Sequence, residues 1–377
     1  MSMKVIHLSH NYVTYLYCMK YFRLLPVLVL CMLVSCSNAE REANALFAQA
    51  EIHSKKSEFG IANDLLTKAI TLKPDHADAL YALGNLHYNR SSLDTAIDLF
   101  RRSLAVKPNN FDCTNKLGNS YSRKDLFDSA IVAYQAAIKL RPDSVLCYNN
   151  LAAAFVSKGE IDKGLAEYQT VITKLMNLSP DYTRELLPDA YYNAANALAR
   201  KKDYSNALLL YKQAIELKPS FPNVHYFMGL TYYKMGEIDL AVTSIERAIA
   251  LQPDYRTALH DLGLLKNQKG DSAVGYNYLG LSASFSGEYE NAIVHFNASI
   301  AKNPAFVDPY YNAGLSYALS GQTQYAINAF EKAVALKPDY LDAHLNLQAL
   351  YLKIHDDGKA DVAARAAARI RALQARK

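Results

Sequence analysis

The feature that most constrains this chain is a proline that returns every 34 residues. Segments such as DYSNALLLYKQAIELKPSF and QYAINAFEKAVALKPDY place an apolar pattern with helical spacing before it. Proline cannot continue a helix, because it lacks the N–H donor. The chain is therefore predicted to form a series of helix pairs that stop at a fixed place. These prolines form three groups in register: Pro74, Pro108, Pro142; Pro219, Pro253; and Pro304, Pro338.

Small and large residues also recur in register within the period. Gly or Ala occupies the eighth position and Ala the twentieth, with large residues between them. In residues 111–144, for example, these are Gly118, Ala130 and Tyr134. Small residues let two helices approach closely, and large ones fill the remaining space. This period and these residues resemble the tetratricopeptide repeat. The resemblance covers residues 43–374 and implies an all-α fold, a right-handed α-α superhelix of about nine hairpins plus a half-repeat.

The domain organisation follows from this register. Residues 43–255 hold six units with an insertion at 179–187, 256–272 form a half-repeat helix, and 273–377 hold the remaining units and a C-terminal capping helix. One hairpin cannot bury its apolar face alone, so stacked neighbours share a continuous core. The predicted units are 43–76, 77–110, 111–144, 145–178, 188–221, 222–255, 273–306, 307–340 and 341–374.

Two irregularities interrupt the register. Around 179–187 we expect an elongated second helix and then a loop, broken by Pro180 and Pro188. Residues 256–272 read as a first helix with no second. That helix could cap one array before another, or it could be an extra helix inside one continuous solenoid. The second alternative is favoured, because no linker-like stretch separates the two parts.

The first 36 residues differ in character from the rest. Lys20 and Arg23 precede an apolar run, Leu24–Ser35, which is too short to span a bilayer and has the pattern of a secretory signal. The run ends in Leu-Val-Ser-Cys36, which resembles a bacterial lipoprotein signal. We therefore expect Cys36 to be the lipidated N-terminus, followed by a short tether over 37–42. A plain signal peptide is the alternative, and Met19 is a possible true start.

Charge and motifs exclude several function classes. Without residues 1–36 the chain carries 38 basic and 36 acidic residues, so it lacks the basic footprint of a nucleic-acid binder. No metal-binding His pair, Gly-rich phosphate loop or nucleophile-elbow motif occurs. His225 and His344 fall at large-residue core positions, where packing is expected. We expect no cofactor, no metal and no enzymatic activity.

Polar and aromatic residues recur where the resemblance places a concave binding face. It implies that the second, fifth, sixth, ninth, twelfth and thirteenth positions of each first helix point into this face. A side-chain amide both donates and accepts, so it suits the backbone of an extended peptide. Tyrosine offers apolar area with a hydroxyl tip. The predicted groove residues are Asn85, Asn119, Asn150, Asn193, Asn196, Asn312, Asn346, Tyr81, Tyr192, Tyr226, Tyr311, Lys116, Arg123 and Arg200.

The cations in this set carry a more specific hypothesis. Lys116, Arg123 and Arg200, together with Asn119, partly match the arrangement by which some members of the family grip a peptide's C-terminal carboxylate. The pattern is incomplete in this chain, so a general peptide groove is the favoured interpretation.

These features predict a protein–protein interaction scaffold, or adaptor, that is lipid-anchored in the bacterial cell envelope, facing the periplasm or at the outer membrane. Its partners would be extended segments of other proteins. A glycan or cell-wall-fragment binding protein is the alternative, since Tyr and Asn also suit sugars. A cryptic enzyme is the third. The identity of the partner, the membrane and the oligomeric state are not encoded in any motif.

Overall fold

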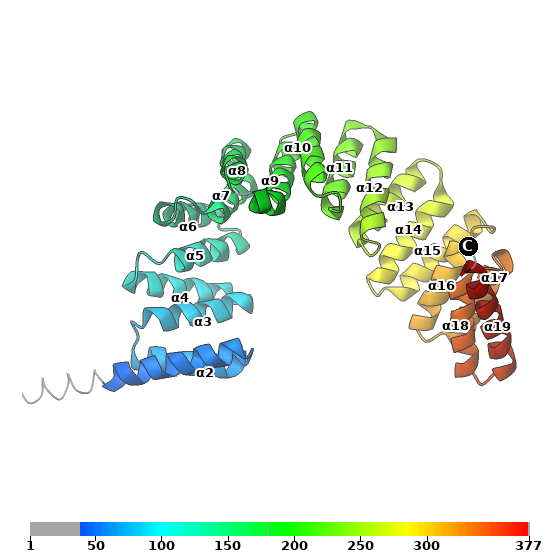
Figure 1. Ribbon diagram of the computed structural model, residues 1–377, viewed down its shortest axis with the longest axis horizontal. Helices are drawn as coiled ribbons and strands as arrows, with labels where there is room; N and C mark the ends of the chain where they lie inside the picture. The colour runs from blue at the N-terminus through cyan, green and yellow to red at the C-terminus, as the bar shows by residue number, and fades with distance from the viewer. Residues whose placement is uncertain (1–37, 179, 376–377) are drawn as a thin grey trace, which may run out of the picture. The chain divides into compact units, whose positions relative to one another are not determined.

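The computed structural model describes residues 38–178 and 180–375, and all the regular secondary structure in these ranges is helical. This confirms the predicted all-α, hairpin-based fold (Figure 1). The signal segment and Cys36 lie outside the described residues. No described helix has the length and apolar character needed to cross a membrane.

The chain divides into two compact units, which are described separately. The first ends at Asn177 and holds a helix over 38–55, α2 (Phe59–Leu72), α3 (Ala77–Asn89), α4 (Leu93–Val106), α5 (Phe111–Arg123), α6 (Phe127–Leu140), α7 (Val145–Lys158) and α8 (Ile161–Met176). The second begins at Leu178 and holds α9 (Pro180–Arg200), α10 (Tyr204–Leu217), α11 (Pro222–Met235), α12 (Ile238–Leu251), α13 (Arg256–Gln268), α14 (Ser272–Phe285), α15 (Tyr289–Lys302), α16 (Asp308–Leu319), α17 (Thr323–Leu336), α18 (Leu341–Lys353) and α19 (Asp357–Gln374).

Four hairpins close on an eighth-position glycine and an aromatic ring, with Gly84, Gly118, Gly280 and Gly314 as the glycines. A Cβ atom added to Gly84 in α3 would lie 2.6 Å from the Phe100 ring in α4. Gly118 meets Tyr134 in the same way, at 2.7 Å. Phe100 is completely buried. The glycine is therefore required by the close approach of the two helices, and any side chain there would push them apart.

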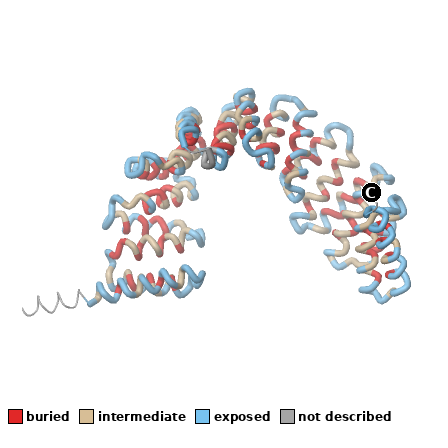
Figure 2. Tube along the Cα trace, in the orientation of Figure 1, coloured by how far each residue is buried: buried red, intermediate tan, exposed pale blue. Residues whose placement is uncertain are grey.

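Burial follows the stacking of neighbours. Buried residues recur along the helices and do not gather in one central core (Figure 2). In the first unit α4 packs on α5 and α6 on α7, while the first helices α3, α5 and α7 also contact one another in turn. In the second unit the first helices α9 and α11 touch, as do α14 and α16. First helices of consecutive hairpins therefore form a row with a shared surface.

The expected loop near residue 180 is absent from the described residues, which corrects the prediction. Helix α9 begins at Pro180 and continues through Pro188 to Arg200. Proline is tolerated at a helix start, where its missing N–H would have no intrahelical partner. An interior proline is costly, but here Leu187 and Pro188 are both buried, which offsets the lost hydrogen bond.

The sequence predicted that residues 256–272 form a first helix that has no second helix, and the structure corrects this for α13. Helix α13 pairs with α14, and α14 pairs again with α15. A Cβ on Gly263 of α13 would lie 2.8 Å from the Leu279 side chain of α14, and one on Gly280 of α14 would lie 2.4 Å from the Phe296 ring of α15. Helix α14 therefore serves as the second helix of one hairpin and the first helix of the next.

A repeated hydrogen bond supports this double role. In the regular hairpin α3–α4, the Ser103 hydroxyl donates to the Ala77 carbonyl at 2.8 Å. The same bond, with the same spacing of 26 residues, joins Ser282 to Arg256 at 3.0 Å and Ser299 to Ala273 at 2.5 Å. Residues 256–306 thus contain two overlapping hairpins. Small residues on two sides of α14 make the overlap possible.

The shared helix gives a first testable prediction. Gly280→Ala should lower the free energy of unfolding of the chain by about 1–3 kcal/mol, because the new methyl group collides with a buried ring. Gly358→Ala is the matched control, since Gly358 is exposed in a helix of the same unit and its nearest neighbour lies at 3.8 Å. The control should be neutral or stabilising by up to about 1 kcal/mol. Urea denaturation of both variants measures the difference, and equal stabilities would contradict the close contact between α14 and the Phe296 ring of α15.

Candidate functional site

In the first unit, two predicted amides meet between first helices. The Asn119 side-chain oxygen in α5 accepts hydrogen bonds from the Tyr134 hydroxyl at 2.8 Å and from the Asn150 amide of α7 at 3.1 Å. Both asparagines are half-buried. Among the described residues, the Nδ2 of Asn119 and the Oδ1 of Asn150 have no protein partner. One donor and one acceptor are thus held side by side, which is the pair that a peptide group requires.

Three further polar pairs follow a fixed rule. A fifth-position residue of one first helix bonds to the sixth-position residue 35 residues later. The bonds are Tyr226 to Asp261 at 2.7 Å, Asn312 to Asn277 at 3.0 Å and Asn346 to Tyr311 at 3.3 Å. Each bond joins consecutive first helices. These side chains therefore connect neighbouring hairpins in addition to any contact they make with a ligand.

Tyr226 differs most from its expected exposed position. It is only 8% exposed, its hydroxyl donates to Asp261, and its ring centroid lies 5.0 Å from that of Tyr255. Tyr311 is half-buried and stacks on Tyr340 with centroids 4.7 Å apart. Both rings thus contribute to the packing between hairpins, as aromatic pairs commonly do.

The predicted cations of the first unit are brought together around one ring. Lys116 Nζ lies 4.9 Å and Arg123 Cζ 4.7 Å from the centroid of the Tyr88 ring. Arg123 also donates to the Tyr88 carbonyl at 3.0 Å and to the Ser91 hydroxyl at 2.8 Å. Tyr88 thus occupies the space between the two first helices. The cation–π contacts commit both positive charges to the protein itself.

Asn85 is the exception among the ninth-position amides. Its Oδ1 atom is buried and has no hydrogen-bond partner, while its amide lies against the Tyr81 hydroxyl. Phe100 of α4 holds the position that Tyr134 holds in α6, and its ring centroid lies 5.9 Å from that of Tyr81. Phenylalanine has no hydroxyl to donate, unlike the Tyr134 that meets Asn119.

In the second unit, Asn196 orders an aromatic cluster. The Tyr211 hydroxyl donates to the Asn196 oxygen at 2.6 Å. The Tyr192 ring packs on Phe221 and Phe227, with centroids 5.4 and 5.7 Å away. Burial raises the pKa of the Tyr192 and Tyr211 phenols, so both remain protonated hydrogen-bond donors at neutral pH. Asn193, one residue from Tyr192, is half-buried.

A cavity of about 400 Å³ opens beside this cluster, between α9, α10 and α11. Two predicted groove residues, Asn196 and Arg200, line it. Sequence reasoning missed the others, although Ala199, Phe227 and Lys234 occupy the twelfth, sixth and thirteenth positions that it had assigned to the groove. The full lining is Asn196, Ala199, Arg200, Lys202, Tyr204, Tyr211, Phe227, Leu230, Thr231 and Lys234.

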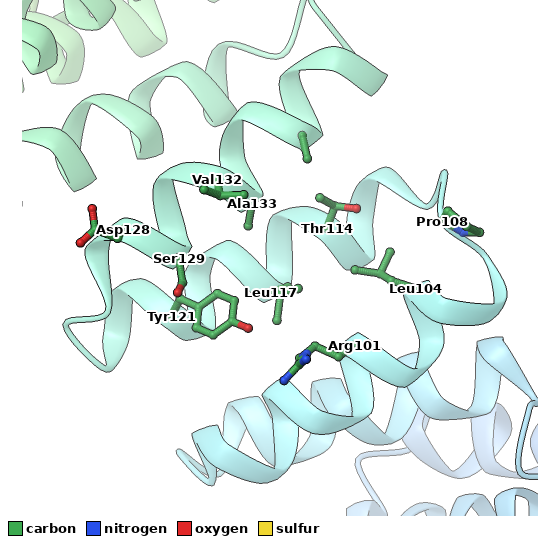
Figure 3. A pocket seen from close by; sticks show the side chains of 11 residues that line it. Arg101, Leu104, Pro108, Thr114, Leu117, Tyr121, Asp128, Ser129, Val132 and Ala133 are labelled. Carbon is green, nitrogen blue, oxygen red and sulfur yellow. The ribbon is translucent and has the colours of Figure 1, made fainter.

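A second cavity of about 550 Å³ lies in the first unit, over α5 and between the second helices α4 and α6 (Figure 3). Its walls include Leu104, Leu117 and Val132, with Arg101 and Asp128 as the charged groups. Val132 is 66% exposed. None of the predicted groove residues lines this cavity. The only sequence signal for it was an apolar residue on the outer side of α6.

The described residues offer no ready catalytic constellation. No group of three His, Cys, Asp or Glu side chains in the described ranges is placed to hold a metal ion. His225 is 8% exposed and His344 half-buried, and their Nε2 atoms lie 3.3 and 3.0 Å from the carbonyls of Pro219 and Pro338. Both histidines thus lie against the end of the preceding hairpin, where they pack as expected.

Comparison with known proteins agrees with this architecture. A TPR repeat family model matches residues 127–159 and 195–236, and other tetratricopeptide repeat models match 47–111, 222–255 and 307–340. No curated protein matches this chain.

Several solved structures are similar to this chain at low sequence identity. A tetratricopeptide repeat protein from Parabacteroides merdae is 14% identical, covering 74% of this chain and 97% of that one with a TM-score of 0.51. The Pseudomonas aeruginosa protein pilF is 16% identical, with coverages of 57% and 94% and a TM-score of 0.44. YrrB, described as a TPR protein with an unusual peptide-binding site, is 23% identical, with coverages of 56% and 95% and a TM-score of 0.31. The family-model matches show that this chain is built from tetratricopeptide repeats.

Proposed function

We propose that this chain is a scaffold that binds extended segments of other proteins along the row of first helices within its units. The observation that carries the proposal is the Asn119–Asn150 pair, which presents one free donor and one free acceptor on adjacent helices. Solenoids of stacked hairpins commonly use such surfaces to bind partners. Amides that contact only the peptide backbone make the binding tolerant of the partner's sequence.

The α9–α11 cavity supports the same function from the second unit. It lies between two consecutive first helices and combines aromatic walls with three exposed cations. Aromatic and Arg side chains in pockets are typical anchors of protein interfaces. A saccharide ligand is the alternative. The Tyr211 hydroxyl in the cavity wall already donates to Asn196, however, which leaves fewer polar groups to bind sugar hydroxyls.

The proposed setting is the bacterial envelope. Cys36 would carry the lipid anchor, because a basic flank and a short apolar run precede it. Several acyl chains on one N-terminus give stable membrane attachment where a single chain gives only marginal binding. The repeats would then face the periplasm or lie at the outer membrane, and the protein would act as an adaptor without enzymatic activity or cofactor.

The peptide-binding proposal predicts a weakened interaction in Asn150→Ala. Blocked peptides with neutral side chains should bind about fivefold more weakly, because one net hydrogen bond is lost. Asn109→Ala is the control, since Asn109 is exposed in a turn of the same unit. Fluorescence anisotropy measures both affinities. If cell-wall saccharides bind and no peptide does, the saccharide alternative replaces this proposal.

The anchoring proposal predicts that Cys36→Ala abolishes the labelling of the protein by radioactive palmitate in a bacterial host and releases the protein from the membrane fraction. Cys31→Ala is the matched control, because Cys31 lies within the apolar run and is not at its end. The control should still be labelled. A Cys36→Ala protein that stays labelled and membrane-bound would exclude lipidation at this residue.

A further inference from the structure

We propose that the cavity between α9, α10 and α11 is an anchoring site for an acidic peptide segment that carries an aromatic residue. The aromatic ring enters the cavity, and neighbouring carboxylates of the peptide pair with the cations at its edge. This inference rests on the proposed peptide-binding function and assigns that function a ligand chemistry.

The inner surface of the cavity offers few free hydrogen-bonding groups to a ligand. Phe227 and Leu230 supply apolar walls, while the hydroxyls of Tyr211 and Thr231 already have partners. Tyr211 donates to Asn196 at 2.6 Å, and the Thr231 hydroxyl donates to the Phe227 carbonyl at 2.8 Å. A polar side chain would lose its water and gain few bonds in this space, whereas an apolar side chain gains contact area.

The cations around the cavity have no acidic partner. Arg200, Lys202 and Lys234 are exposed, and none forms an ion pair with the described residues.

Three positive charges that line one cavity without an acidic partner favour an anionic ligand. One of them, the Lys234 ammonium, also lies 5.8 Å from the centroid of the neighbouring Tyr233 ring. The three charges attract an anionic ligand over several ångströms and select against basic partners, because unlike charges across an interface mainly set association rate and specificity. The complementary ligand therefore carries carboxylates on either side of the group that enters the cavity.

The first unit shows which group fits between two first helices. Tyr88 of α3 holds the twelfth position, and its ring lies within 5 Å of Lys116 and Arg123 of α5. The equivalent positions in the second unit are Ala199 of α9, and Phe227 and Lys234 of α11. Where the first unit has its own aromatic ring, the second has only a methyl group.

This comparison makes the proposal specific for an aromatic residue. A ring supplied by the ligand would take the place that the Tyr88 ring takes in the first unit. There it would meet the Phe227 ring on one side and the Lys234 ammonium on the other. Aromatic pairs and cation–π contacts each favour such a ring beyond the area that it buries.

The test uses the full chain and a fluorescein-labelled peptide, Gly-Asp-Glu-Phe-Asp-Gly, blocked at its carboxyl end so that no terminal carboxylate contributes. Ala199→Tyr should abolish binding, because the introduced ring fills the cavity. Lys234→Ala and Arg200→Ala should each weaken binding about fivefold, as expected for the loss of one partly exposed charge pair. Lys212→Ala, an exposed lysine of α10 that does not line the cavity, should have no effect.

Peptide variants complete the experiment. Replacing the acidic residues by Asn and Gln, or Phe by Ala, should each reduce binding at least tenfold, and raising the salt concentration should weaken the parent peptide. Equal binding of either peptide variant, or unchanged binding by Ala199→Tyr and Lys234→Ala, would overturn the inference. If neutral peptides still bind and depend on Asn150, the peptide-binding function stands and only this site is excluded. If no peptide of any charge binds, both proposals fail.

Discussion

The contact between a glycine on one helix and a fully buried ring on the next determines how this chain folds. Because Gly84 has no side chain, α3 can lie directly on the Phe100 ring of α4. The same contact sets the distance between the helices of other hairpins and leaves their remaining apolar faces for the neighbours. Consecutive first helices then touch, and this closeness places side chains 31 to 35 residues apart within hydrogen-bonding distance.

The regular hairpins could be predicted from sequence because their determinants are local. Glycine at 159 and 236 ends α7 and α11 in the left-handed conformation, with φ of 96° and 85°, as expected for a helix C-terminus. The exceptions could not be predicted in this way. Pro188 remains helical because burial offsets a local penalty. Helix α14 has two partners because Gly275 lets α13 approach one side of it and Gly280 lets α15 approach another. The repeat pattern used for the prediction assigns only one hairpin partner to each helix, so it could not predict this arrangement.

The candidate site was only partly predictable for a similar reason. The family register assigned Asn119, Asn150 and Asn196 to the concave face; the structure brings Asn119 and Asn150 into hydrogen-bonding contact and places Asn196 in the lining of a cavity. The register could not show which amides already have partners, because those partners come from another hairpin. Nor could it identify the cavity in the second unit. A cavity forms where a small side chain leaves space between helices, and an alanine such as Ala199 does not by itself indicate a binding site in the sequence.

A repeat scaffold can open or close a binding site by changing one side chain. In the first unit the Tyr88 ring fills the gap between first helices and holds Lys116 and Arg123 in cation–π contacts. In the second unit Ala199 leaves the equivalent gap empty and Lys234 without a carboxylate partner among the described residues. The helix pairs close on small residues in both cases, Gly84 and Gly118 in the first unit and Ala195 and Gly229 in the second, so the change at the twelfth position leaves these contacts intact. The residues that set the distance between helices are thus different from the residues that fill the gap between first helices. Stability depends on the former and binding on the latter, so nearly identical hairpins can present different surfaces.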